Sequence, residues 1–200
     1  ISDIGSLADL VNLNILRLGG NNISDISPLR KLTNLTILDL HSNGITDIDA
    51  LSGLIHLTQL ELSSNVISEI SALGELNELT YLVLMSNQIN DIRPLENLIH
   101  LQKLVLYGNQ IRDISALSGM TALITLILDN NTITDVSSLS GLESLLSLSL
   151  SYNNITDISP LAALSKLKSL NLNNNQVRDV TVLAEMPSLI YIDVSNNPIE

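Results

Sequence analysis

One asparagine recurs every 22 residues and sets a strict period for the whole chain. The phrase NQINDI at 87–92 returns as NQIRDI at 109–114 and as NQVRDV at 175–180, with no insertion to break the register. A constant internal period of this length indicates copies of one supersecondary unit that stack on each other. The nine members of the series are Asn21, Asn43, Asn65, Asn87, Asn109, Asn131, Asn153, Asn175 and Asn197.

The apolar residues keep the same period and indicate the shape of each unit. An apolar-x-apolar pair such as Leu104 and Leu106 precedes each Asn, and such alternation is typical of a β-strand. Further apolar residues follow at two, five, eight, eleven and fourteen positions after the Asn. This pattern predicts a coil that passes through one short strand and returns along a different path.

Such a pattern is that of the leucine-rich repeat. We expect residues 1–200 to form a single α/β-type solenoid of about nine repeats, here called rungs, with a parallel concave β-sheet and short 3₁₀ or α turns on the convex side. Ser27-Pro28 and Ser159-Pro160 lie at one phase of the repeat. A Ser side-chain cap followed by Pro favours the start of such a turn.

Two polar columns are expected to hold the rungs in place. Where each strand ends, an Asn amide offers donors and acceptors to its own loop and to the next, so we interpret the Asn series as a structural ladder. An acidic column precedes each turn and can accept backbone N–H bonds there. A row of calcium sites is the alternative, although no single loop gathers the several oxygens that the ion requires. The acidic column consists of Asp3, Asp25, Asp47, Glu69, Asp91, Asp113, Asp135, Asp157 and Asp179.

Side chains suited to catalysis or metal binding are sparse. The chain has no cysteine, and His56 and His100 lie two rungs and thus roughly 10 Å apart, too far to bind one zinc ion. His41 lies on the strand face, and no His can be placed beside the Ser-rich stretch 144–152 to act as a base. We therefore expect neither an enzyme nor a cofactor.

The charge pattern argues against nucleic acid as a partner. Nine of the 21 acidic residues stand in the acidic column, so the net charge of −12 is concentrated along one edge. The nine Lys and Arg residues are scattered and form no basic stripe. Apolar runs such as 82–85 fall far short of the roughly 20 residues that cross a bilayer, so no membrane insertion is expected.

The residues that alternate with the strand leucines point out onto the concave sheet and are free to vary. In the middle rungs they form an apolar group, here called the central patch: Tyr81, Val83, Met85, Val105, Tyr107 and Ile127. Charged residues around it are Glu61, Lys103 and Asp129. Exposed apolar surface rimmed by charge is typical of a protein-binding site, although Val and Ile are also ordinary strand formers. Only Ser and Asn occupy the sheet in the two rungs centred on 149 and 171, a contrast that strand preference alone does not explain.

The ends of the chain lead to a separate expectation. The sequence starts at Ile1 within a repeat phrase and without an initiating Met, so we expect a segment of a longer product that lacks terminal caps. Uncapped solenoids expose apolar rows, which predicts end-to-end self-association. The rows concerned contain Leu10, Leu13 and Leu16 at one end and Leu189, Ile192 and Ile199 at the other.

The phrase NNISDISPLRKLTNLTILDLHSNGITDI at 21–48 resembles the internalin class of 22-residue leucine-rich repeats from bacterial surface proteins. Its signature, N-x-I-x-D-I-x-P/A-L-x-x-L, covers essentially the whole chain. The resemblance implies a secreted or wall-attached protein that binds a host cell-surface receptor through its concave face, with a role in adhesion and virulence. A cytosolic scaffold of the phosphatase-regulating type, which typically lacks the DI-x-P-L phrase, and a structural spacer are the alternatives.

Overall fold

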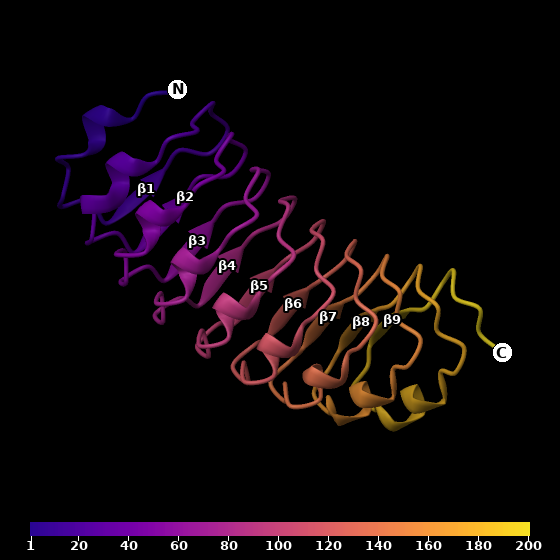
Figure 1. The fold of residues 1–200 in the computed structure, drawn as a ribbon. Helices are drawn as coiled ribbons and strands as arrows, with labels where there is room; N and C mark the ends of the chain where they lie inside the picture. The colour runs from indigo at the N-terminus through magenta and orange to yellow at the C-terminus, as the bar shows by residue number, and fades with distance from the viewer.

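The computed structural model describes all 200 residues as one elongated coil, with the two termini at opposite ends (Figure 1). Nine parallel strands of three residues form a single sheet in sequence order. Equivalent residues of neighbouring rungs are cross-strand partners, as Leu82 and Leu104 are. The predicted fold class, a leucine-rich repeat solenoid, is confirmed. The strands are β1 (Ile15–Arg17), β2 (Ile37–Asp39), β3 (Gln59–Glu61), β4 (Tyr81–Val83), β5 (Lys103–Val105), β6 (Thr125–Ile127), β7 (Ser147–Ser149), β8 (Ser169–Asn171) and β9 (Tyr191–Asp193).

One 3₁₀ turn per rung lies on the side opposite the sheet, as expected. All of these helices, three to five residues long, are too short to span a bilayer. They are η1 (Gly5–Leu7), η2 (Ser27–Lys31), η3 (Asp49–Leu51), η4 (Ser71–Leu73), η5 (Arg93–Leu95), η6 (Ser115–Leu117), η7 (Ser137–Leu139), η8 (Ser159–Ala163) and η9 (Thr181–Glu185).

The capping of these turns differs from the prediction. Ser27 is the first residue of η2 and not its cap; the N-cap is Ile26, which makes no side-chain cap bond. The carboxylate of Asp25 accepts the Ser27 N–H at 2.8 Å instead. The cap is thus supplied from outside the turn, because the acidic column lies two residues before it. Pro28 follows at a position that needs no amide hydrogen.

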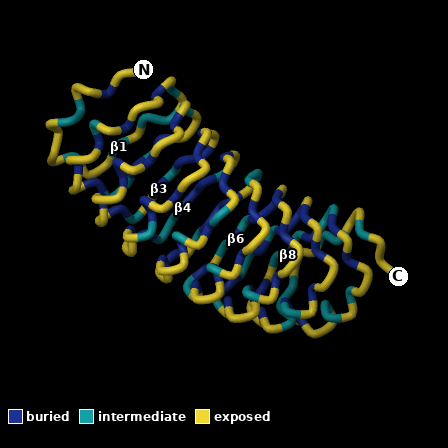
Figure 2. The backbone as a smooth tube through the Cα atoms, viewed as in Figure 1, coloured by how far each residue is buried: buried dark blue, intermediate teal, exposed yellow.

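A single apolar core runs the length of the coil. Figure 2 shows buried segments along the coil between its two ends, and the buried apolar side chains form one continuous cluster from Ile4 to Met186. Leu82 in β4 and Leu84 directly after it, for example, are fully buried. Each rung therefore shares its apolar layer with its neighbours, which is how repeats that cannot bury their own leucines become stable.

The repeating Asn amides join neighbouring rungs. Asn87 donates from Nδ2 to the carbonyls of Leu84 at 3.1 Å and of Leu62 at 3.0 Å, and its Oδ1 accepts the N–H of Ile67 at 3.1 Å. Leu62 and Ile67 belong to the preceding rung, so the expected bond to the next loop is wrong in direction. Each Asn side chain thus bonds the preceding rung. The loop that follows the Asn donates an N–H to the Asn of the next rung, as Ile89 does to Asn109 Oδ1.

The two ends of the coil expose part of their apolar rows. Leu10 is exposed at the first rung, and Ile192 and Ile199 are exposed at the last. Leu13 and Leu189 are half-buried. The end surfaces are thus partly apolar, and association through them remains a prediction.

Candidate functional site

The concave sheet offers three outward positions on every rung. In β4 and β5 the first two positions pair across the strands as Tyr81 with Lys103 and Val83 with Val105. The third position lies two residues beyond, at Met85 and its equivalents. Since parallel strands lie about 4.8 Å apart, side chains at one position of successive rungs are in reach of each other.

The central patch is narrower than predicted. Val83 and Val105 are only 5% and 7% exposed, so the expectation that they form exposed surface is wrong. They occupy the middle one of the three outward positions, and in register the pair is flanked by the larger side chains of Glu61 and Ile127, which removes it from water. Tyr107 is 40% exposed and Met85 is half-buried, so the accessible apolar surface surrounds the two valines. Its other members, Tyr81 and Ile127, are also half-buried.

Asp129 is not a free charge at the rim of this patch, as had been expected. It is only 6% exposed, because it lies within a cluster of hydroxyl groups from the next rung. Its Oδ1 accepts the Ser149 hydroxyl at 2.5 Å, the Ser151 N–H at 2.9 Å and the Ser151 hydroxyl. Sequence reasoning missed this cluster, although the separation of 20 and 22 residues places both serines on the adjacent rung.

The other two charged residues beside the patch lie where they were expected. The Nζ atom of Lys103 lies 4.9 Å from the centre of the Tyr81 ring, a cation–π contact that orients both side chains. Glu61 accepts the Ser63 N–H at 2.9 Å and the Ser63 hydroxyl through Oε1. Both charged side chains are half-buried, at opposite sides of Tyr81.

Asp39, His41 and Ser63 raise the question of nucleophilic catalysis, which sequence reasoning did not consider for this group. His41 Nδ1 lies 2.7 Å from Asp39 Oδ1. The His41 ring, however, lies over Gly19 on the preceding rung, whereas Ser63 is on the following rung and donates its hydroxyl to Glu61. No hydrogen bond joins His41 to Ser63, so the arrangement lacks the base that a serine nucleophile needs.

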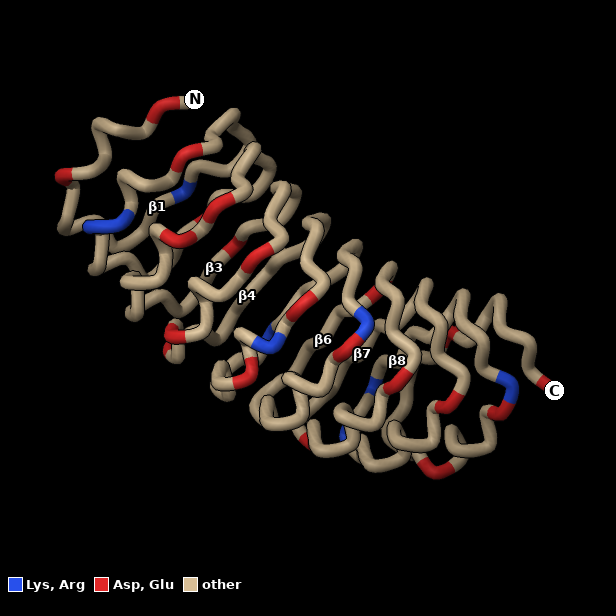
Figure 3. Tube along the Cα trace, in the orientation of Figure 1, with Lys and Arg blue, Asp and Glu red and all other residues tan.

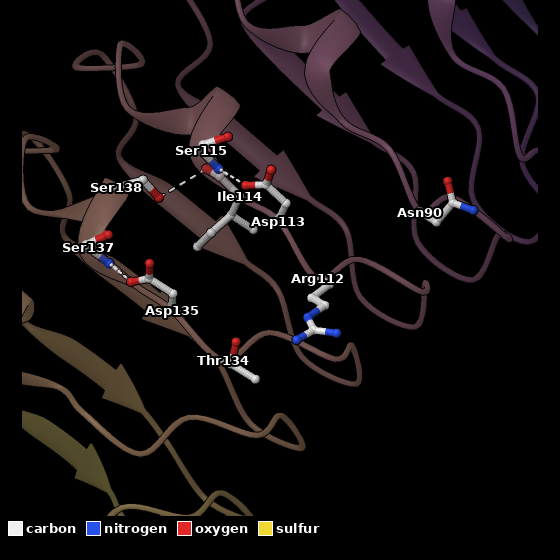
Figure 4. Close-up of a pocket in the computed structure, with 9 residues that line it drawn as sticks. All are labelled: Asn90, Arg112, Asp113, Ile114, Ser115, Thr134, Asp135, Ser137 and Ser138. Carbon is white, nitrogen blue, oxygen red and sulfur yellow. Dashed lines mark hydrogen bonds between the residues drawn. The ribbon is translucent and has the colours of Figure 1, made fainter.

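The acidic column forms a row along one edge of the coil (Figure 3). Except for Glu69, its members accept the backbone N–H two residues on, as Asp113 does from Ser115 at 2.9 Å and Asp135 from Ser137 at 2.8 Å (Figure 4). The expected local bonding is thereby confirmed. These backbone bonds hold the pKa values of both carboxyl groups below the ordinary range, since they favour the charged form.

Arg93 adds a stronger interaction at one point of this edge. Its guanidinium pairs with Asp91, with Nη2 2.6 Å from Oδ2, and lowers the pKa of that carboxyl group to about 2. Two adjoining hollows of about 350 Å³ each lie here, one of them lined by Arg112 and Asp113 (Figure 4). No three His, Asp or Glu side chains gather closely enough to bind a metal ion, because each carboxylate stays with its own turn.

Family models for leucine-rich repeats match the chain from residue 11 onwards. The model described as Leucine Rich repeats (2 copies) matches 11–53, 77–119, 99–141, 121–163, 143–185 and 165–200, and that described as Leucine rich repeat matches 33–89. The crystal structure of internalin C2 from Listeria monocytogenes is 39% identical, with a TM-score of 0.91 over 94% of this chain and 83% of its own. The chain belongs to the internalin class of leucine-rich repeat proteins.

A second internalin agrees with this assignment, and a plant receptor ectodomain shares the leucine-rich repeat fold. Internalin F of Listeria monocytogenes is 37% identical, with a TM-score of 0.97 over 100% of this chain, which spans 59% of the internalin F chain. The ectodomain of the Arabidopsis thaliana receptor kinase GASSHO1/SCHENGEN3 is 27% identical, with a TM-score of 0.80 over 99% of this chain and 29% of its own. No curated protein matched the sequence significantly. The two internalin structures confirm the resemblance to the internalin class that residues 21–48 indicate.

In this internalin the polar residues that recur in each repeat and the variable residues of the concave sheet make different contacts. The Asn ladder and the acidic column bond the backbone, as Asn87 and Asp113 do. The side chains of the central patch make no such hydrogen bonds to the backbone. A binding role for the patch remains a prediction.

Proposed function

We propose that this internalin binds a protein partner through the central patch on its concave sheet. The observation that supports the proposal most directly is the arrangement of Tyr81, Met85, Tyr107 and Ile127 around two buried valines. Aromatic and Met side chains are enriched in protein interfaces, and the surrounding charges of Glu61 and Lys103 resemble an interface rim. The chain acts as a binding module and not as an enzyme.

We further propose that the protein acts at the bacterial surface or after secretion, with a host cell-surface receptor as its partner. Membership of the internalin class supports this proposal, and fold analogy is its main basis. The Arabidopsis receptor ectodomain was solved in complex with CASPARIAN STRIP INTEGRITY FACTOR 2, which supports the use of this fold for polypeptide ligands.

Crosslinking capture from whole host cells tests the proposal. The bait is the protein itself, compared with a Tyr81→Ala/Tyr107→Ala variant of unchanged circular dichroism. Loss of two interface aromatics is expected to weaken binding by about 2 kcal/mol or more. Tyr152→Ala is the matched control, because Tyr152 is exposed but lies outside the strands.

A membrane ectodomain captured by the unaltered protein and by the Tyr152 variant, but not by the double variant, is the expected result. Capture that is indifferent to the loss of Tyr81 and Tyr107 would contradict the use of the central patch. Selective capture of a cytosolic phosphatase would instead favour an intracellular scaffold, and no specific partner at all would favour a structural spacer.

A further inference from the structure

The two halves of the concave sheet differ in how their polar side chains are satisfied. Towards the C-terminus they bond each other: Asp129 accepts from Ser149, and Asn173 donates to Asp193 at 2.9 Å. Towards the N-terminus Asp39 and Glu61 bond only residues of their own rung, each through one oxygen, Oδ1 and Oε1. Asp129 also accepts through one oxygen, but it is buried, whereas Asp39 and Glu61 are half-buried and face the concave side. The second oxygen of Asp39 and of Glu61 therefore has no partner within the protein.

These two carboxylates line a hollow of about 190 Å³ on the concave side, beside the central patch. Asp39 and Glu61 are direct cross-strand partners in β2 and β3, and Glu61 is in turn the partner of Val83. Gln59 and the Tyr81 ring complete the side nearest the patch, and Arg17 stands at the far end. The hollow and the patch are thus one continuous surface.

Two of the three charged residues in the hollow, Glu61 and Arg17, form no ion pair inside the molecule. The protein's four ion pairs include neither Glu61 nor Arg17, and Asp39 is joined only to His41. The Tyr81 ring already accepts a cation from the other side, at Lys103. Two carboxylates about 5 Å apart beside an aromatic ring suit a guanidinium or ammonium group.

We propose that this hollow receives a lysine or arginine side chain of the protein partner whose apolar side chains cover the central patch. The inference rests on the proposed function and specifies the chemistry of the partner. Glu61 and Ile127 occupy the same position three strands apart, about 14 Å. An extended partner segment spans that distance in about four residues, so it presents its basic residue about four positions from an apolar one.

Arg17 makes the hollow selective. It neighbours Asp39 in register, and its positive charge faces the same space. One cation is therefore accommodated between Glu61 and Tyr81, whereas a second one would meet Arg17. Removing Arg17 and removing Glu61 should change the affinity for a cation in opposite directions.

A titration followed by backbone amide NMR shifts tests the proposal without knowledge of the partner. The probe is Nα-acetyl-arginine methylamide at millimolar concentration, and its uncharged citrulline analogue is the control ligand. Shifts are expected at Leu60, Glu61 and Tyr81 with the arginine probe alone. Glu61→Gln should weaken the response about two- to fivefold, and Arg17→Gln should strengthen it.

Asp193→Asn is the matched control variant. Asp193 stands at the repeat position of Glu61, six rungs away, and like Glu61 it accepts the N–H two residues on. Asp193→Asn should leave the titration unchanged. Asp39→Asn replaces Glu61→Gln if the latter alters the circular dichroism. Equal responses to arginine and citrulline, or no effect of Glu61→Gln and Asp39→Asn, would overturn the proposal. Because no partner is involved, that failure would leave the capture experiment on Tyr81 and Tyr107 to decide the proposed function separately.

Discussion

The His41 ring lies where the Cβ atom of an alanine at position 19 would have to be. Gly19 precedes His41 by one rung, and the two residues hold the same position on the concave sheet. The absence of a side chain at Gly19 thus permits His41 to lie flat and to bond Asp39 at 2.7 Å. A pair of this kind is a contact between variable positions and not part of the repeat.

Gly19→Ala should therefore displace the His41 ring and remove its bond to Asp39. We expect a loss of about 1 kcal/mol in the free energy of unfolding, measured by urea denaturation, and a changed NMR signal of the His41 ring. In a His41→Ala background the same substitution should cost almost nothing. Gly44→Ala is the control, since its Cβ would meet only an ordinary contact of 3.7 Å with the Ile23 carbonyl. Equal costs in both backgrounds would contradict the explanation.

Substitution of a ladder residue should cost more than substitution of an exposed Asn in the same rung. Asn87→Ala leaves the Ile67 N–H without its acceptor and removes one of the two Asn donors from each of the Leu62 and Leu84 carbonyls, so we expect a loss of about 1–3 kcal/mol. Asn90→Ala should change the free energy of unfolding by less than about 0.5 kcal/mol, because Asn90 is exposed and makes no hydrogen bond. Similar denaturation curves for the two variants would show that the ladder bonds do not stabilise the coil.

Substitutions in the central patch should differ in their effect on the free energy of unfolding, according to whether the residue is buried or accessible. Val83→Ala is expected to cost about 1–2 kcal/mol of unfolding free energy, since the Val83 side chain is buried. Tyr107→Ala should cost less than about 0.5 kcal/mol, because much of its ring is in water. Thermal or urea unfolding measures both. A large destabilisation by Tyr107→Ala would remove it from the binding experiments.

The acidic column predicts a loss of stability in acid. In the folded chain the pKa of Asp91 is about 2, and the pKa values of Asp113 and Asp135 are lowered as well. An unfolded Asp has a pKa of roughly 3.9. Above about pH 5 both states are ionised and the stabilisation is complete. Below it the unfolded chain binds protons first, so stability falls progressively towards about pH 2.

Urea midpoints measured across this pH range check the prediction. Asp91→Asn should flatten the profile, because it removes the carboxylate paired with Arg93. Glu69→Gln is a suitable control, since Glu69 holds the same repeat position and makes no bond to the N–H of Ser71. A profile unaffected by Asp91→Asn would show that the column has no role in the acid response.

The exposed ends predict association of the 200-residue chain. Leu10 and Ile192 lie on opposite end surfaces, and stacking one coil on another would remove both from water. Sedimentation velocity should reveal species larger than the monomer that grow with concentration. Leu10→Asp and Ile192→Asp should each reduce them, whereas a strictly monomeric folded chain at high concentration would contradict the prediction.

Periodicity was sufficient to predict the fold, and it was less informative about the variable surface. The register of Leu82 with Leu104 follows directly from the 22-residue spacing. The burial of Val83 and Asp129 does not, because it depends on side chains from neighbouring rungs that differ each time. Ser27 was misjudged as a cap because the turn begins at Ser27 itself and not one residue later, and the Ser27 N–H is bonded by Asp25.

The backward reach of the Asn amides gives the coil a direction. The N–H of Ile155 is bonded by Asn175 of the following rung, and the N–H of Val177 by Asn197. A rung that peels away at the C-terminal end removes the Asn oxygen that bonds an N–H of the rung left behind, whereas one lost at the N-terminal end removes a carbonyl that accepts from the remaining Asn amide, as Leu18 does from Asn43. Within the Asn ladder, fraying therefore leaves a backbone N–H unsatisfied at the C-terminal end and a side-chain amide short of one acceptor at the N-terminal end.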